Sequence, residues 1–251
     1  MPLVNHPTGN YRFLPGIAPY SCGVVAMPGH EVVHVIFSEP LGYRAGFEKI
    51  EGFLDSQDRP RASLCSIELR SPKPFSFQGF GELNAEYAEI LKSWGLFVDG
   101  VNPVARTNVS PEFLANPEVV IHGFAYTRPT EQHANRTFVV AGGGELPDGF
   151  LDAESIVERG NLTPEGLRLK SEFVMNLMES RLFGLGGTWA DVTSTNVYTI
   201  HGMDQIVPGV IAAQAGPAML QGIRWFYTRP PIVEIEFEMD LRGVVHEIYL
   251  A

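Results

Sequence analysis

The sequence has few of the features that mark secreted or membrane proteins. It contains only two cysteines among 251 residues, Cys22 and Cys65, which is too few for a disulfide framework. No apolar run reaches the roughly 18–20 residues of a membrane span, and residues 1–11 are polar, without the apolar stretch of a signal peptide. We therefore expect a cytoplasmic protein with no membrane partner.

Basic residues are scarce as well. Lys and Arg number 18 against 29 Asp and Glu, so the formal net charge at pH 7 is −11. A surface of this sign repels phosphate backbones, and we therefore expect no nucleic-acid partner. The 45% hydrophobic and 19% charged residues are typical of a globular protein, and the length fits one large domain or two small ones.

The sequence offers no support for a metal or a nucleotide cofactor. His30 and His34 are four residues apart, but the pattern around them predicts a hairpin rather than the helix that a paired-histidine metal site needs. Gly142, Gly143 and Gly144 resemble a phosphate loop only weakly, because no Gly-Lys-Ser/Thr follows them. A Gly-x-Ser-x-Gly elbow is absent, although a Ser/His/Asp triad stays open. We expect no cofactor and no metal.

Hydrophobic periodicity predicts a first pass of secondary structure with the order β-β-α-β-α-β-β. Apolar residues alternate in the strand segments and recur at helical spacing in the helix segments. The expected strands cover residues 21–26, 32–37, 64–69, 104–109 and 118–126, and the expected helices lie at 47–54 and 83–94.

A similar pass begins near residue 137, after a polar segment at 127–135. Thr163 followed by Pro164 predicts a helix start, with Thr as N-cap and Pro in the first turn. The repeated pattern suggests a tandem duplication, and we expect domains at 1–130 and 131–251. The expected strands of the second pass cover 137–141, 191–200, 223–228 and 232–241, with a weakly helical segment at 208–220.

Several segments carry a resemblance to a known family. They are residues 19–20, 84–87 and 103–109 in the first half, and residues 138–143, 189–198, 224 and 233–238 in the second. In this order they resemble the Rid (YjgF) family of small trimeric proteins that hydrolyse enamines and imines. The resemblance implies an α+β fold of two Rid-like, chorismate-mutase-like domains, each a mixed sheet with two helices on one face. It also implies a homotrimer.

The resemblance further implies site residues. The arginine that anchors the substrate falls on Arg106 in the first half and on Arg224 in the second, and the glutamate that activates water falls on Glu236. In the first half the glutamate position holds His122. Neither half carries the whole pattern, so either one pocket is assembled from both halves or one half serves as scaffold.

Further lining residues follow from the same resemblance. A pocket tyrosine falls on Tyr20, and the position two after the arginine holds Asn108 in one half and Phe226 in the other. Gly142 stands where the family has a serine, and the main chain around Gly142 and Gly143 can supply hydrogen bonds.

These residues suggest a cofactor-independent hydrolytic deaminase. A guanidinium binds a carboxylate through two parallel hydrogen bonds, and a carboxylate such as Glu236 can polarise water for attack on C=N. The expected substrate is a small carboxylated enamine or imine of the 2-aminoacrylate or 2-aminomuconate kind. Two alternatives stay open: a chorismatase-like lyase or hydrolase of aromatic-compound metabolism, and a non-catalytic ligand-binding or scaffold protein. Arg106 and Arg224 could equally be structural ion-pair residues, and the acids at 234–238 a solvated strand face.

Overall fold

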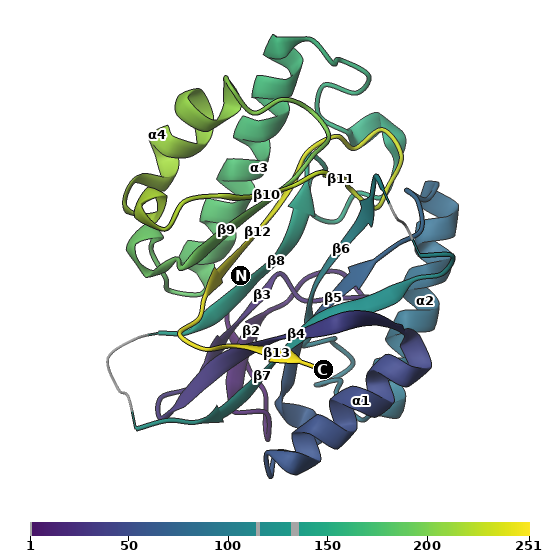
Figure 1. Cartoon of the computed structure of the whole chain (residues 1–251), viewed down its shortest axis with the longest axis vertical. Coiled ribbons are helices and arrows are strands. Elements are labelled where there is room, and N and C mark those ends of the chain that lie inside the picture. Colours follow the sequence, from purple (N-terminus) through teal and green to yellow (C-terminus); the bar gives the residue numbers. More distant parts are fainter. Residues whose placement is uncertain (1, 114–115, 132–135) are drawn as a thin grey trace.

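The computed structural model describes residues 2–113, 116–131 and 136–251 and contains two mixed β-sheets (Figure 1). One sheet has seven strands in the order β1-β2-β3-β8-β12-β9-β10, and the other has six in the order β11-β6-β5-β7-β4-β13. The strands are β1 (Val4–Asn5), β2 (Tyr11–Leu14), β3 (Gly23–Ala26), β4 (His30–Gly42), β5 (Leu64–Arg70), β6 (Ala105–Pro111), β7 (Val120–Pro129), β8 (Phe138–Gly144), β9 (Ser194–Tyr198), β10 (Arg224–Phe226), β11 (Thr228–Arg229), β12 (Glu238–Gly243) and β13 (Glu247–Leu250).

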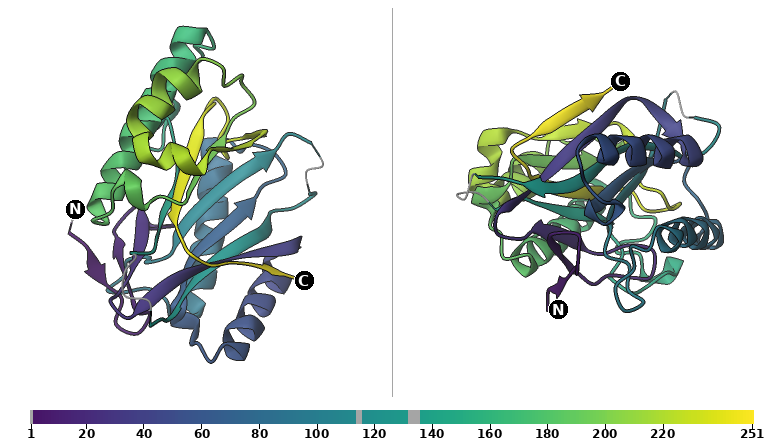
Figure 2. Two further views of the ribbon diagram at one scale, coloured as in Figure 1. Left: turned by 60° about the vertical axis from the view of Figure 1, so that its left-hand side comes forward. Right: turned by 90° about the horizontal axis from the view of Figure 1, so that it is seen from below.

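Helices cover the outer faces of both sheets. The helices α1 (Tyr43–Ser56) and α2 (Phe77–Ser93) pack on the six-stranded sheet, and α3 (Pro164–Gly184) packs on the seven-stranded sheet at the other end of the molecule (Figures 1 and 2). The predicted start of α3 is confirmed: the Thr163 side chain accepts a hydrogen bond from the Gly166 amide at 3.1 Å. No helix of the described chain is long and apolar enough to cross a bilayer.

The two sheets contain the same four-strand arrangement. The order β6-β5-β7-β4 in one sheet corresponds to β10-β9-β12-β8 in the other. In each set the first two strands are parallel and the remaining neighbours are antiparallel. The chain therefore contains this four-strand arrangement twice, while the predicted division into domains at 1–130 and 131–251 stays a prediction.

Strands from both ends of the chain cross between these units. The N-terminal strands β1 to β3 extend the seven-stranded sheet beside β8, and the C-terminal β13 pairs with β4 in the six-stranded sheet. Figure 1 shows the yellow β13 lying along the dark blue β4. The sheets are thus tied together through main-chain hydrogen bonds at both ends of the sequence.

The expected fold of two Rid-like domains, each with two helices on one face, is wrong. Each sheet borrows strands from the other half of the chain, and only the first unit has two long helices. In the second unit the place of the second helix is taken by π, α and 3₁₀ turns over residues 207–221. Pro208 and Pro217 interrupt regular helical hydrogen bonding there. The general α+β class is compatible with the structure.

The last predicted strand, 232–241, also needs correction. The structure begins β12 at Glu238, and residues 231–237 form an irregular segment in which Glu234 has a φ of 70°. A positive φ at a non-glycine residue is incompatible with continuous strand geometry. This irregular segment lies against the main cavity of the protein.

Candidate active site

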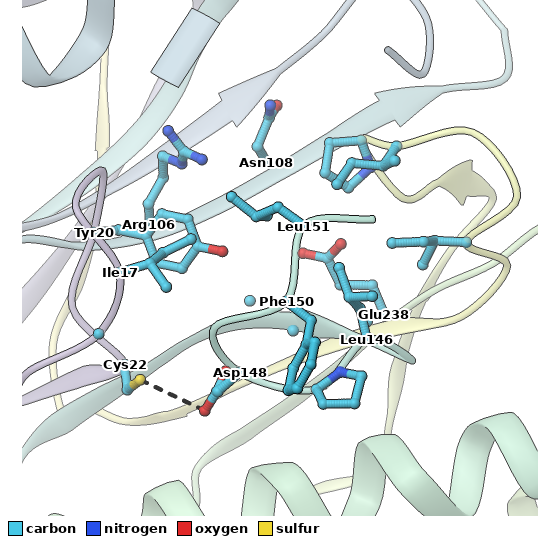
Figure 3. Close-up of a pocket in the computed structure, with 18 of the residues that line it drawn as sticks. Ile17, Tyr20, Cys22, Arg106, Asn108, Leu146, Asp148, Phe150, Leu151 and Glu238 are labelled. Atoms are coloured by element: carbon cyan, nitrogen blue, oxygen red, sulfur yellow. Dashed lines mark hydrogen bonds between the residues drawn. The ribbon is translucent and has the colours of Figure 1, made fainter. Parts of the chain in front are cut away.

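A cavity of about 230 Å³ opens where the two sheets meet. The strand β6 supplies one wall, β8 and β12 supply another, and the loop at residues 146–151 closes over them (Figure 3). A hydrogen bond from the Thr107 hydroxyl to the Asp240 carboxylate, 2.8 Å long, joins the two sheets beside this cavity. Its walls therefore come from segments far apart in the sequence.

Arg106 is the principal cation of the cavity wall. Its side chain is buried, and its guanidinium lies over the rings of Tyr20 and Tyr87 at 4.7 and 4.9 Å. The Nη2 atom donates to Asn84 Oδ1 at 2.7 Å, whereas Nη1 is buried without a hydrogen-bond partner. Because buried polar groups are normally satisfied, this unpaired donor in the cavity wall is a candidate to bind an anion.

Asn108 presents a second unsatisfied donor. Its Oδ1 accepts a hydrogen bond from the Ser71 hydroxyl at 2.8 Å, while its Nδ2 is buried and unpaired. Asn108 and Arg106 are two residues apart on β6, so their side chains leave the same face of the strand. Together they form a pair of donors of the kind that a carboxylate accepts.

Glu238 brings an acid to the same cavity. It is the first residue of β12 and is only 5% exposed. Burial raises its pKa well above the usual value, and the neighbouring Asp240 adds to the rise, although Arg106 and Arg181 oppose it. Glu238 therefore holds its proton to a higher pH than an exposed glutamate does, and it can act as a proton donor in the cavity.

Gly142 leaves room for this carboxyl group. A Cβ atom at residue 142 would contact the Glu238 carboxyl and come within 3.1 Å of Thr107 Cα. Any larger residue would have to displace the acid or the β6 main chain. The small residue therefore lets β8 approach β6 at the cavity and leaves room for the Glu238 carboxyl group.

Arg181 and Asp148 organise the opposite wall. The Arg181 Nη1 atom donates to the Ala141 and Gly142 carbonyls at 3.0 and 3.1 Å, and Nη2 donates to Asp148 Oδ1 at 2.7 Å. Cys22 completes the cluster, with its thiol donating to Asp148 at 3.9 Å. Burial raises the pKa of this thiol, so it stays protonated at neutral pH and is a poor nucleophile.

Comparison with known proteins identifies the family of the chain. A family model described as "2-aminomuconate deaminase CnbZ" matches residues 3–248. The chain belongs to the CnbZ family. A 2-amino-5-chloromuconate deaminase from Comamonas testosteroni is 43% identical over 244 residues, which are 96% of either chain. The predicted enzyme class, a deaminase acting on a C–N bond, is confirmed at this level.

Membership of the CnbZ family corrects the predicted Rid membership, which is wrong. Among solved structures, a chorismatase crystal structure matches with a TM-score of 0.51 and 13% identity, over 88% of this chain and 77% of that one. At this identity the match shows the fold alone. The CnbZ-family chain thus has a chorismatase-like arrangement of mixed sheets rather than two Rid-like domains.

The structure gathers five of the predicted site residues in this cavity of the CnbZ-family chain. They are Arg106, Tyr20, Asn108, Gly142 and Gly143, and all five line it. Their roles in substrate binding stay predictions.

The other three predicted residues lie elsewhere. Arg224 and Phe226 line a second cavity of about 400 Å³. Glu236 lies in the irregular segment before β12 and lines neither cavity, since its carboxylate pairs with His201 Nε2 at 2.8 Å. Because β12 begins at Glu238, the acid that lines the first cavity is Glu238, two residues after the expected Glu236.

Glu238, Arg181 and Asp148 were missed by the sequence analysis. For Arg181 a signal exists, because it interrupts the apolar stripe that Val174 and Met178 form on α3. A charge within a buried helix face needs a partner and so marks a special position. Asp148 lies in a loop whose sequence gives no such signal.

Anion binding is the chemistry that the lining residues offer. Within residues 2–113, 116–131 and 136–251, no group of three or more His, Cys, Asp or Glu side chains is placed to hold a metal ion. Arg106 and Asn108 are the groups suited to a carboxylate, and Glu238 is suited to proton transfer.

Proposed function

We propose that the protein hydrolyses 2-aminomuconate or a ring-fission product like it to the 2-oxo acid and ammonia. The observation that carries the proposal is the buried Glu238 in one cavity with the unpaired donors of Arg106 and Asn108. Burial raises the pKa of Glu238, which suits it to proton transfer. Membership of the CnbZ family and the chloromuconate-deaminase relative support the same substrate class.

The substrate class fits the lining of the cavity. 2-Aminomuconate is a planar, conjugated dicarboxylate with an amino group on C2, next to the C1 carboxylate. In this proposal Arg106 Nη1 and Asn108 Nδ2 bind the C1 carboxylate. Apolar side chains of the wall, Ile17, Leu151 and Ile232, contact the diene. The ion pair between Arg106 and the C1 carboxylate of the substrate fixes the position of C2 relative to Glu238.

The first step is proton transfer to carbon. Glu238 donates its proton to the conjugated chain, the enamine π electrons form the new C–H bond, and C2 becomes the carbon of an iminium ion. Glu238 is then a carboxylate beside a cation, which stabilises both groups in the dry cavity. The carboxylate removes a proton from water while the water oxygen bonds to C2.

The second step expels ammonia. Glu238 gives its proton to the nitrogen of the tetrahedral intermediate and takes the proton of the C2 hydroxyl, the C2–N bond breaks, and the C2–O bond becomes a carbonyl. One water is consumed and one ammonia is released per substrate, and Glu238 ends protonated as it began. The proposal therefore assigns to Glu238 the role expected for Glu236, and assigns the carboxylate anchor to Arg106 rather than Arg224.

Turnover of enzymatically generated 2-aminomuconate tests the proposal. Ammonia release should be fast with the natural sequence and should fall about 10²–10⁴-fold in Glu238→Gln, the usual contribution of a general acid or base. Glu236→Gln is the matched control, because Glu236 lies two residues away and pairs with His201 outside the cavity. It should keep nearly full activity.

Two results would contradict the proposal. One is turnover by Glu238→Gln close to that of the natural sequence, and the other is ammonia release no faster than in buffer. Chorismate, tested in parallel, separates the chorismatase-like alternative. Consumption of chorismate without turnover of 2-aminomuconate would favour the chorismatase-like function.

A further inference from the structure

The second cavity, of about 400 Å³, lies at the other junction of the two sheets. Its wall combines side chains of β4, β5 and β7 with side chains of β10, β12 and β13. The lining residues are His34, Ile36, Glu68, Arg70, His122, Arg224, Trp225, Phe226, Arg242 and Tyr249.

The repeated strand arrangement makes this cavity the counterpart of the first. β10 lies parallel to β9 as β6 lies parallel to β5, and each carries an arginine followed two residues later by a second lining residue. These pairs are Arg224 with Phe226, and Arg106 with Asn108. β7 lies in one unit where β12 lies in the other, and it contributes His122 where β12 contributes Glu238.

Arginines dominate the charge of the second cavity. Arg70 and Arg242 are buried, and Arg224 is about half exposed. The lining carboxylate is Glu68, whose Oε1 accepts from Arg242 Nη2 at 2.9 Å and whose Oε2 lies 3.7 Å from Arg70 Nη2. The lining of the second cavity therefore contains three guanidinium groups and one carboxylate.

Two further acids lie just behind this wall. Glu247 accepts from Arg224 Nη1 at 3.3 Å, and Asp240 lies 3.6 Å from Arg242 Nη2. Each of these contacts uses a single guanidinium nitrogen. Since a guanidinium has five N–H donors, the half-exposed Arg224, which donates to Glu247 from Nη1, keeps donors for a ligand.

The second cavity lacks an acid that could transfer a proton as Glu238 does. Burial, together with the charge of Arg70, lowers the pKa of His122 to about 4, so its imidazole is neutral at neutral pH. Its ring nitrogens make no hydrogen bond to any described residue of the chain. They can therefore pair with a ligand but hold no proton acidic enough for the first step of deamination.

We propose that the second cavity is a non-catalytic binding site for a planar, unsaturated carboxylate. Arg224 binds the acid group at the mouth, Arg70 and Arg242 attract it from within, and the rings of Trp225 and Tyr249 contact its flat body. The choice of a conjugated dicarboxylate as the ligand class rests on the proposed function. The presence of an anion site rests on the arginines alone.

Muconate, which lacks the amino group and cannot be deaminated, is the probe. Titration calorimetry on the natural protein should give two sites per chain. Arg224→Glu should weaken one site at least tenfold and leave the rate of deamination within twofold, because Arg224 is absent from the first cavity. Arg106→Ala should weaken the other site and abolish turnover. Arg44→Ala, whose side chain is 93% exposed on α1, is the control and should change neither site.

Trp225 supplies an independent readout. In Arg106→Ala protein, muconate should still quench tryptophan fluorescence, and an added Trp225→Phe change should remove that response. A single site that survives Arg224→Glu and disappears with Arg106→Ala would overturn this inference and leave the proposed function standing. Two sites in a protein that releases no ammonia from 2-aminomuconate would refute the function and leave the second site.

Discussion

The raised pKa of Glu238 predicts that removing its ionisation lowers the activity of the protein and raises its stability at neutral pH. The side chain is buried beside Asp240, and its pKa in the folded protein is raised well above the ordinary value of about 4.3. Glu238→Gln keeps the size of the side chain and removes its ionisation. We expect the variant to be inactive and more stable than the natural protein at neutral pH.

The sign and size follow from proton linkage. Below about pH 4 both the folded and the unfolded chain carry the proton on Glu238, and the group costs nothing. As pH rises above that value the unfolded chain releases the proton while the folded chain keeps it. The free energy of unfolding therefore falls by up to about 1.4 kcal/mol per pH unit until the raised pKa is passed.

Urea unfolding of both proteins at pH 5, 6 and 7 measures this effect. Other titrating groups act equally in the two proteins, so the difference between their unfolding free energies isolates Glu238. That difference should grow with pH in favour of Glu238→Gln. Parallel curves for the two proteins across this range would show that Glu238 is ionised in the folded state, and the proposed proton donor would be refuted.

Three further predictions follow. Arg106→Ala should lower kcat/KM for 2-aminomuconate about 10²-fold or more, since it removes a buried carboxylate partner; a change under threefold in steady-state assays would argue against the anchor. Lys170→Met should destabilise the fold by about 3–5 kcal/mol in urea unfolding, because it leaves the fully buried Glu145 without its ion-pair partner at 3.1 Å; a loss below about 1 kcal/mol would contradict this. A homotrimer stays a prediction, and light scattering at the mass of one chain would reject it.

The sequence predicts the repeated elements well where local pattern decides. The apolar stripe around Tyr87 and the alternation around Ile67 correspond to α2 and β5, and the Thr163 cap fixes the start of α3. Such features depend on neighbouring residues alone. The short strands β1, β2 and β13 were not predicted. The partner of β13 is β4, about two hundred residues away, whereas β1 and β2 pair with each other and β2 pairs with β3.

The residues of the candidate site likewise include some that the sequence predicts and some that it does not. Arg106 and Asn108 lie two residues apart on one strand that the local pattern predicts, and the family resemblance assigned both to the site. The resemblance to the Rid family placed the acid at Glu236, on an expected strand over 232–241. Nothing in the sequence pattern reveals the turn at Glu234 that makes β12 begin later, at Glu238. The approach of β12 to β6 across the two sheets is a long-range contact, which a single sequence does not encode locally.

Infrared difference spectroscopy tests the central claim most directly. The carbonyl stretch of a protonated carboxylic acid is distinct from the bands of a carboxylate, and subtracting the Glu238→Gln spectrum cancels every other acid of the protein. At pH 7 the natural protein should show one protonated carboxyl band that the variant lacks. A difference spectrum with carboxylate bands alone at pH 7 would mean that Glu238 is already ionised and cannot deliver the first proton.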